Sequence, residues 1–207
     1  MTHVEQPVTV ANEQSTINAC MKWLHRTGET HVDRFDFKKL PRIDRRNEDI
    51  RRATFEGVEY EAITKAMRSY CAKSQKGVDP DEILLRQVVR HWVLVAANSG
   101  LRVGEQRQLC WNDVNVETHK VGGEDLKFAR IHVRAETTKV RMSRTFLCRS
   151  GQYFERLKKF TKPDNNDDLV FSVDGEQKLS ERLLLKHFKK IMDLAKVTDW
   201  QKRKLVP

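Results

Sequence analysis

The stretch from residue 81 to residue 99 most constrains how this chain can fold, because its predicted helix is apolar on most sides. The apolar side chains that share this stretch are Leu84, Leu85, Val88, Val89, Trp92, Val95 and Ala96. A helix of this kind is buried, so we expect it at the centre of a domain. Its longest strongly apolar run is six residues, 92–97, far short of the roughly 20 that a membrane span needs.

Helical periodicity continues on both sides of this stretch. Apolar residues three and four positions apart predict helices around residues 17–24, after Thr54, over 153–160 and from 180 to 196. The last of these carries His187 on its apolar face, so we expect this histidine in the core. A short helix is expected over residues 103–110.

Between these helices the hydrophobic period changes to two. Alternation predicts strands over residues 114–118, 128–135 and 145–147, with Gly122-Gly123 as a turn. The predicted fold class is therefore mainly α with a small three-stranded antiparallel sheet, an α+β protein. Residues 29–52 are polar and aperiodic and predict a linker, which divides the chain into a part over 1–45 and a domain over 46–207.

Basic residues exceed acidic ones by ten, and the excess is concentrated in three clusters, residues 22–52, 127–149 and 186–207. Together these clusters carry a net charge of +15, the electrostatic footprint of a nucleic-acid-binding protein. A solvated basic surface is the alternative interpretation of each cluster alone. A membrane surface is disfavoured, because no basic amphipathic helix has an exposed aromatic face.

The four cysteines lie tens of residues apart and form no Cys-x-x-Cys pair. This spacing argues against a zinc site and a disulfide scaffold, and it suits a reducing cytosol. The N-terminus has neither the basic start nor the apolar block of a secretory signal. We therefore expect a cytoplasmic protein that needs no metal or cofactor.

Residues 97–113, ANSGLRVGEQRQLCWND, carry the most chemical information. Arg102 is expected at the start of the short helix, with Glu105 on the same face. A guanidinium in this position can donate two parallel hydrogen bonds to a phosphate, and the helix dipole adds positive potential. Leu101 and Leu109 would anchor the helix to the core. An Arg-x-x-Glu pair by itself is usually a surface salt bridge.

The pattern GLRVGExxxLxWxD over residues 100–113, after an apolar helix and before three predicted strands, resembles the first arginine box of the tyrosine recombinases, the phage-integrase family. Residues 136–148, ETTKVRMSRTFLC, resemble the β-hairpin of this family, and residues 169–196 resemble the segment that leads to its second catalytic box. The two helices predicted upstream resemble the end of its DNA-clamping domain and the start of its catalytic domain. In all, the resemblance spans about residues 14–200.

This resemblance implies a recombinase catalytic domain over 46–207, incomplete at its C-terminus, and a remnant of the core-binding domain within 1–45. It also implies that Arg102 binds the non-bridging oxygens of the scissile phosphate, that Glu105 buttresses the pocket, and that Lys139 protonates the leaving 5′ oxygen. The alternatives for Lys139 are a DNA-backbone contact or a solvated turn residue. Further cations are expected to contact DNA: Arg141, Arg144, Lys186, Lys189 and Lys190.

The reaction of the family cleaves and rejoins DNA at specific sites through a 3′-phosphotyrosine. It needs a His-x-x-Arg box, a further His or Trp, and a tyrosine, which the resemblance places beyond residue 207. The tyrosines present are poor nucleophile candidates, because Tyr60 and Tyr70 precede Arg102 and Tyr153 lies on an apolar helix stripe. We therefore expect this chain alone to be inactive, since catalytic groups that act as a unit lose nearly everything when one is missing.

Two functions remain open from the sequence. One is a DNA-binding fragment of a tyrosine recombinase or integrase, and the other is a non-enzymatic DNA-binding module or modulator of a full-length recombinase. A helix-turn-helix regulator is less favoured, because it would need a compact recognition helix. Double-stranded DNA is the expected partner, other recombinase protomers on the DNA are further candidates, and the expected location is the prokaryotic cytosol or nucleoid.

Overall fold

The computed structural model describes residues 7–38, 54–72, 77–138, 141–201 and 203. The chain divides into two compact units, residues 1–51 and 52–207. The boundary predicted after residue 45 falls within 39–53, outside the described residues.

The first unit consists of helix α1 (Pro7–Arg26) and the segment that follows it. The helix includes the predicted residues 17–24 and begins ten residues earlier. Gly28 adopts a left-handed conformation just beyond the helix, with φ at 79°. Asn18 then holds the following segment, because its side-chain amide donates to the Phe35 carbonyl (3.2 Å) and accepts from the Phe35 N–H (2.8 Å).

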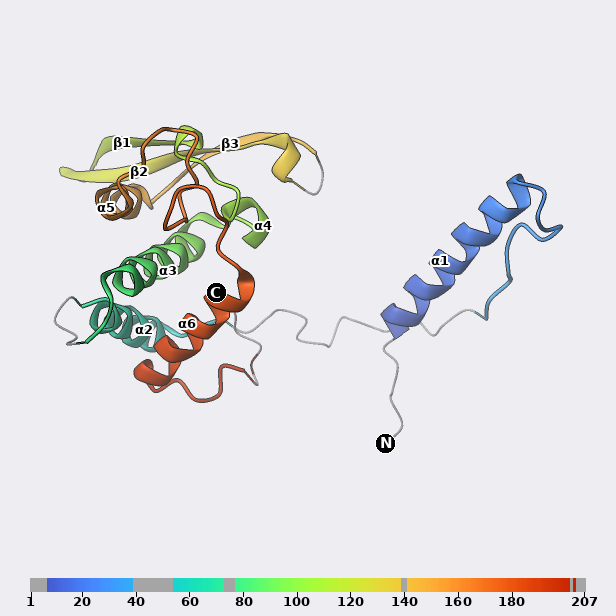
Figure 1. Ribbon diagram of the computed structural model, residues 1–207, viewed down its shortest axis with the longest axis horizontal. Helices are drawn as coiled ribbons and strands as arrows, with labels where there is room; N and C mark the ends of the chain where they lie inside the picture. Colours follow the sequence, from blue (N-terminus) through green and yellow to red (C-terminus); the bar gives the residue numbers. More distant parts are fainter. Residues whose placement is uncertain (1–6, 39–53, 73–76, 139–140, 202, 204–207) are drawn as a thin grey trace. The chain divides into compact units, whose positions relative to one another are not determined.

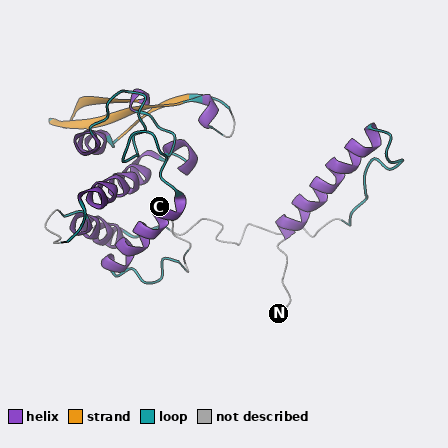
Figure 2. Cartoon of the chain, viewed as in Figure 1, coloured by secondary structure: helices purple, strands orange, loops and turns teal. Residues whose placement is uncertain are grey.

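The second unit stacks a small sheet on two layers of helices (Figures 1 and 2). Helices α5 (Gly151–Thr161) and α3 (Pro80–Ser99) lie beneath the sheet, and α2 (Gly57–Tyr70) and α6 (Glu181–Ala195) pack together below α3. The central position predicted for residues 81–99 is confirmed, since α3 contacts both α5 and α6 and Trp92 is 1% exposed. No helix within the described ranges is both long enough and apolar enough to cross a membrane.

Local signals at both ends of α3 explain its limits. The Asp79 side chain accepts from the Asp81 N–H (3.3 Å), and Pro80 occupies the first helical position, where its missing N–H costs nothing. At the other end Gly100 takes a left-handed conformation with φ at 66°, which a glycine adopts without strain.

The sheet is antiparallel and three-stranded, in the order β1 (Val114–Val121), β2 (Glu124–Val133) and β3 (Arg144–Cys148). The α+β class is therefore confirmed. Strands β1 and β2 continue to the Gly122-Gly123 turn, beyond the limits predicted from alternation, because both glycines have positive φ (61° and 86°) and make a two-residue hairpin.

The register decides which side chains face the helices. Ile131 lies opposite Phe146, and Val133 lies opposite Arg144, so these four side chains share one side of the sheet. That side packs on the core, since Ile131 and Val133 are buried. Arg144 therefore points toward the helical layer at one end of the sheet.

The hydrophobic core lies within the second unit and joins its helices to the sheet. Its largest fully buried side chains include Trp92, Phe154, Phe171 and Phe188. The core position predicted for His187 is confirmed: the ring is buried, and its Nδ1 lies 2.8 Å from the hydroxyl of Tyr70.

Candidate functional site

Helix α4 (Val103–Gln106), which carries the arginine motif, is a single turn. The helix predicted over 103–110 is wrong beyond residue 106, because the following backbone pairs with a distant segment. The Val170 N–H donates to the Leu109 carbonyl (2.9 Å), and the Trp111 N–H donates to the Asp168 carbonyl (3.0 Å). A helix of one turn has little dipole, so the positive potential at Arg102 comes mainly from side chains.

Buried contacts fix α4 to the rest of the domain. Leu101 and Leu109 are buried on either side of it, as predicted. The buried Gln106 donates through Nε2 to the Trp92 carbonyl on α3 (2.8 Å), and Arg107 donates through Nε to the Leu179 carbonyl just before α6 (2.8 Å). The position of Arg102 is therefore set by contacts to two other helical segments.

Glu105 is the centre of the site and is fully hydrogen-bonded. Its Oε1 accepts from Nη1 of Arg102 (3.1 Å) and from Nη1 of Arg144 (3.0 Å). Its Oε2 accepts from the Arg102 backbone N–H (3.0 Å) and from Nη2 of Arg144 (2.7 Å). Arg144 thus binds the carboxylate with both terminal nitrogens, the strongest geometry for this kind of pair.

These bonds hold the pKa of Glu105 well below its usual value, at about 2. The hydrogen bond from Arg144 is the largest cause, burial opposes it, and the two bonds from Arg102 lower the pKa further. The same contact raises the pKa of Arg144. Glu105 is therefore a permanent anion near neutral pH, and it orients the two arginines rather than transferring protons.

The two arginines differ from Glu105 in exposure. The Glu105 side chain is 2% exposed, whereas the side chains of Arg102 and Arg144 are 60% and 39% exposed. Within the described part of the chain, Glu105 is the only hydrogen-bonding partner recorded for the Arg102 side chain. Two guanidinium groups and one carboxylate leave a net charge of +1, with free N–H donors that can bind an oxyanion such as phosphate.

The structure joins Arg102, Glu105 and Arg144, and it joins none of the other predicted site residues to them within the described ranges. Lys139 lies outside the described residues. Arg141 is exposed in a left-handed conformation with φ at 51°. The three predicted lysines of α6 are exposed and lie on one side of the helix, and they are Lys186, Lys189 and Lys190.

Sequence reasoning missed how Arg144 is used, because it treated this residue only as a DNA contact. The two partners are 39 positions apart, so no local motif links Glu105 to Arg144. The available signal was side-chain alternation: Arg144 has the same strand parity as the buried Cys148 and therefore points inward. Sequence reasoning also missed Arg134, which donates to the Gln108 carbonyl (2.6 Å) and ties the end of β2 to the segment after α4.

The three tyrosines have different surroundings. Tyr70 is buried against His187, and Tyr153 packs half-buried on the core. Tyr60 lines a mainly apolar cavity of about 250 Å³ together with Leu101 and Val103, the two residues that flank Arg102 in the chain. Among the described residues, no group of three or more His, Cys, Asp or Glu side chains is arranged to hold a metal ion.

Comparisons with protein-family models, with curated proteins and with solved structures found no match to this chain. The resemblance to the tyrosine recombinases therefore rests on the motifs and their order.

Proposed function

We propose that this chain binds double-stranded DNA as part of a tyrosine-recombinase-type catalytic domain, with Arg102 on a backbone phosphate. The observation that carries the proposal is that Arg144 donates two hydrogen bonds to the buried carboxylate of Glu105, which also accepts from Arg102. A surface salt bridge would not need a buried carboxylate with four donors. A phosphate pocket needs such a carboxylate, because an arginine that is already held in place loses little conformational entropy when it binds phosphate.

In this proposal each residue has a distinct task. Arg102 contacts phosphate oxygens, and Glu105 and Arg144 act as positioning residues that hold its guanidinium. Lys139 keeps the role that the resemblance implies, a proton donor to the leaving 5′ oxygen. Arg141 and the α6 lysines are exposed and supply further backbone contacts.

The environment of the tyrosines favours the second candidate, a DNA-binding module that does not cleave DNA. A nucleophilic tyrosine must reach the phosphorus atom, whereas Tyr70 is buried beside His187 and Tyr153 packs half-buried on the core. We therefore expect no covalent complex when this chain is incubated with a nicked duplex and separated on a denaturing gel. A covalent protein–DNA band that survives denaturation would contradict the module and favour the enzyme.

DNA binding is tested by fluorescence anisotropy with a labelled duplex over a range of salt concentrations. Arg102→Ala should weaken binding about tenfold and reduce the slope of log K against log salt by about one, because one phosphate contact is lost. Lys65→Ala, which removes one exposed charge from α2, is the matched control and should change binding much less. Equal effects of the two variants, or binding that does not depend on salt, would refute the phosphate contact at Arg102.

A further inference from the structure

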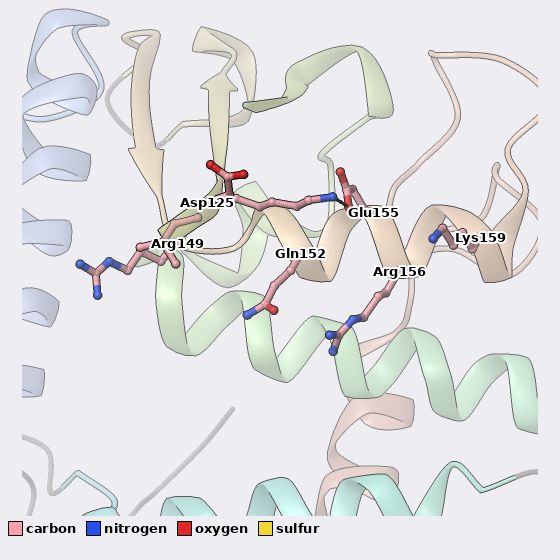
Figure 3. A pocket seen from close by; sticks show the side chains of 8 residues that line it. Asp125, Arg149, Gln152, Glu155, Arg156 and Lys159 are labelled. Carbon is pink, nitrogen blue, oxygen red and sulfur yellow. Dashed lines mark hydrogen bonds and ion pairs between the residues drawn. The ribbon is translucent and has the colours of Figure 1, made fainter. Parts of the chain in front are cut away.

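A second cluster of cations lines an open cleft between α5 and the turn end of β2 (Figure 3). The cleft has a volume of about 430 Å³. Its lining combines four basic side chains, two acidic ones, one amide and one leucine: Lys127, Arg149, Arg156, Lys159, Asp125, Glu155, Gln152 and Leu126. We call it the α5 cleft.

Gly151 brings α5 close enough to the sheet to form this cleft. A Cβ atom at residue 151 would lie 2.7 Å from the Phe128 carbonyl oxygen and 2.8 Å from the Lys127 carbonyl carbon, so only glycine fits there. The first turn of α5 therefore lies directly on the backbone of β2. The residues that follow at helical spacing, Gln152, Glu155 with Arg156, and Lys159, then form one polar row along the cleft.

The α5 cleft has more basic side chains than carboxylates that could pair with them. Lys127, on β2, forms an ion pair with Glu155. Arg149, Arg156 and Lys159 are exposed, and no ion pair is recorded for any of them among the described residues. In Figure 3 Arg156 projects from α5 on the same side as Gln152, and Arg149 extends from the opposite end of the cleft. With Asp125 counted, the cleft keeps a net charge of +2.

Positive charge continues from the cleft onto the neighbouring helices. Arg90 on α3 is half-buried, and its Nε has no hydrogen-bond partner among the residues that the structure describes. Burial lowers its pKa, and the charges of Arg68 on α2 and Arg156 lower it further. Arg68, Arg90 and Arg156 therefore lie near enough to repel one another, and none of them forms an ion pair with a carboxylate of the described residues. A bound anion would relieve this repulsion.

The α5 cleft and the Arg102 site lie at opposite ends of the sheet. Lys127 is near the turn end of β2, and Val133, opposite Arg144, is at the other end. Val133 lies six residues after Lys127 along β2, and a strand of this length spans about 20 Å. The buried side chains Ala129 and Ile131 lie between the two ends on the same side of the sheet. A single phosphate group therefore cannot contact both places.

We propose that the α5 cleft is a second anion site, which binds phosphate groups through Arg149, Arg156 and Lys159. Its lining favours phosphate over an aromatic or lipid ligand, because Leu126 is its only apolar member and cationic donors dominate. The phosphate belongs either to a nucleic-acid backbone or to a small free polyphosphate. This inference does not depend on the proposed function, since it uses none of the residues around Arg102.

The test is isothermal titration calorimetry of the full chain with sodium tripolyphosphate at low salt. The variant removes the three unpaired cations together (Arg149→Gln, Arg156→Gln, Lys159→Gln). The matched control removes three exposed cations elsewhere (Lys22→Gln, Lys65→Gln, Arg182→Gln), so that net charge is equal in both. We expect saturable binding that the cleft variant weakens roughly tenfold or more, because each lost charged hydrogen bond has a large effect.

A second titration identifies the source of the phosphate. If a short DNA duplex displaces tripolyphosphate and loses affinity in the cleft variant, the ligand is a nucleic-acid backbone; if DNA does not compete, the ligand is a free polyphosphate. The proposal is overturned if tripolyphosphate does not bind saturably, if both triple variants weaken it equally, or if a poly-glutamate peptide binds the cleft equally well. DNA binding that is insensitive to Arg102→Ala would instead count against the proposed function alone.

Discussion

Replacing Glu105 by glutamine tests whether this carboxylate holds the arginine pair together. Glutamine has the same shape, but it carries no charge, and its NH2 group would face N–H donors of Arg102 and Arg144. The lowering of the Glu105 pKa from 4.5 to about 2 corresponds to roughly 3 kcal/mol in favour of the charged form. Solvent screens the two partly exposed arginines, so we expect Glu105→Gln to cost about 1–2 kcal/mol at pH 7.

The stability difference between wild type and Glu105→Gln should depend on pH. Because folding lowers the pKa of Glu105, its stabilisation is complete above about pH 4.5 and is lost as the pH falls toward 2. The difference between wild type and Glu105→Gln should therefore be largest at neutral pH and shrink below pH 4.5. Protonated glutamate and glutamine present the same kind of group to the arginines, so the two proteins should converge.

Urea unfolding followed by circular dichroism, repeated at several pH values, measures this difference. Glu117→Gln is the matched control, because Glu117 also binds an arginine with both carboxylate oxygens and also has a pKa of about 2. Its partner Arg130 is exposed on the outer side of the sheet, so the control should cost less at neutral pH. Equal stability of Glu105→Gln and wild type at pH 7, or a difference that persists unchanged to pH 2, would refute the role given to Glu105.

Three further substitutions have defined outcomes. Arg144→Ala should raise the pKa of Glu105, because the hydrogen bond from Arg144 is the main cause of its low value, and carboxyl NMR titration would detect the change. Gly151→Ala should destabilise the chain by about 1–3 kcal/mol in urea unfolding, because the new Cβ meets the backbone of β2; an unchanged midpoint would show that α5 moves freely. Tyr70→Phe should cost about 1–3 kcal/mol by leaving the buried Nδ1 of His187 without its partner, and wild-type stability would contradict that bond.

The fold class could be predicted from the local spacing of apolar residues along the sequence. The all-round apolar character of residues 81–99 predicted a central helix, and Trp92 and Val95 are buried within α3. Alternation predicted the three strands, but it did not predict how far β1 and β2 extend. Their ends are set by the two positive-φ glycines of the turn, which continue the pairing past the last alternating residue.

The site could be predicted only in part, because long-range pairing completes it. The Arg102–Glu105 contact was expected from helical spacing and is present. The length of α4 was predicted incorrectly, since Leu109 pairs with Val170, a segment about 60 residues away. The hydrogen bonds from Arg144 to Glu105 depend on the register in which β3 pairs with β2, and no local sequence pattern specifies this register.

The α5 cleft was missed for a similar reason. The basic cluster that includes Lys127 and Arg149 was noticed, but Arg156 and Lys159 lie on a helix outside it. Only the close approach of α5 to the strand, permitted by Gly151, brings these cations together.

The two ion pairs at the ends of the sheet, Lys127 with Glu155 and Arg144 with Glu105, also limit which changes of chain length the protein can accept. One added or deleted residue within β2 would turn the side chains on one side of the change to the opposite face of the sheet. It would also shift the pairing of β2 with β3 that places Arg144 opposite Val133. A change of the same size in the connection between β2 and β3 would leave both in place. The number of residues in β2 should therefore stay constant among homologous chains.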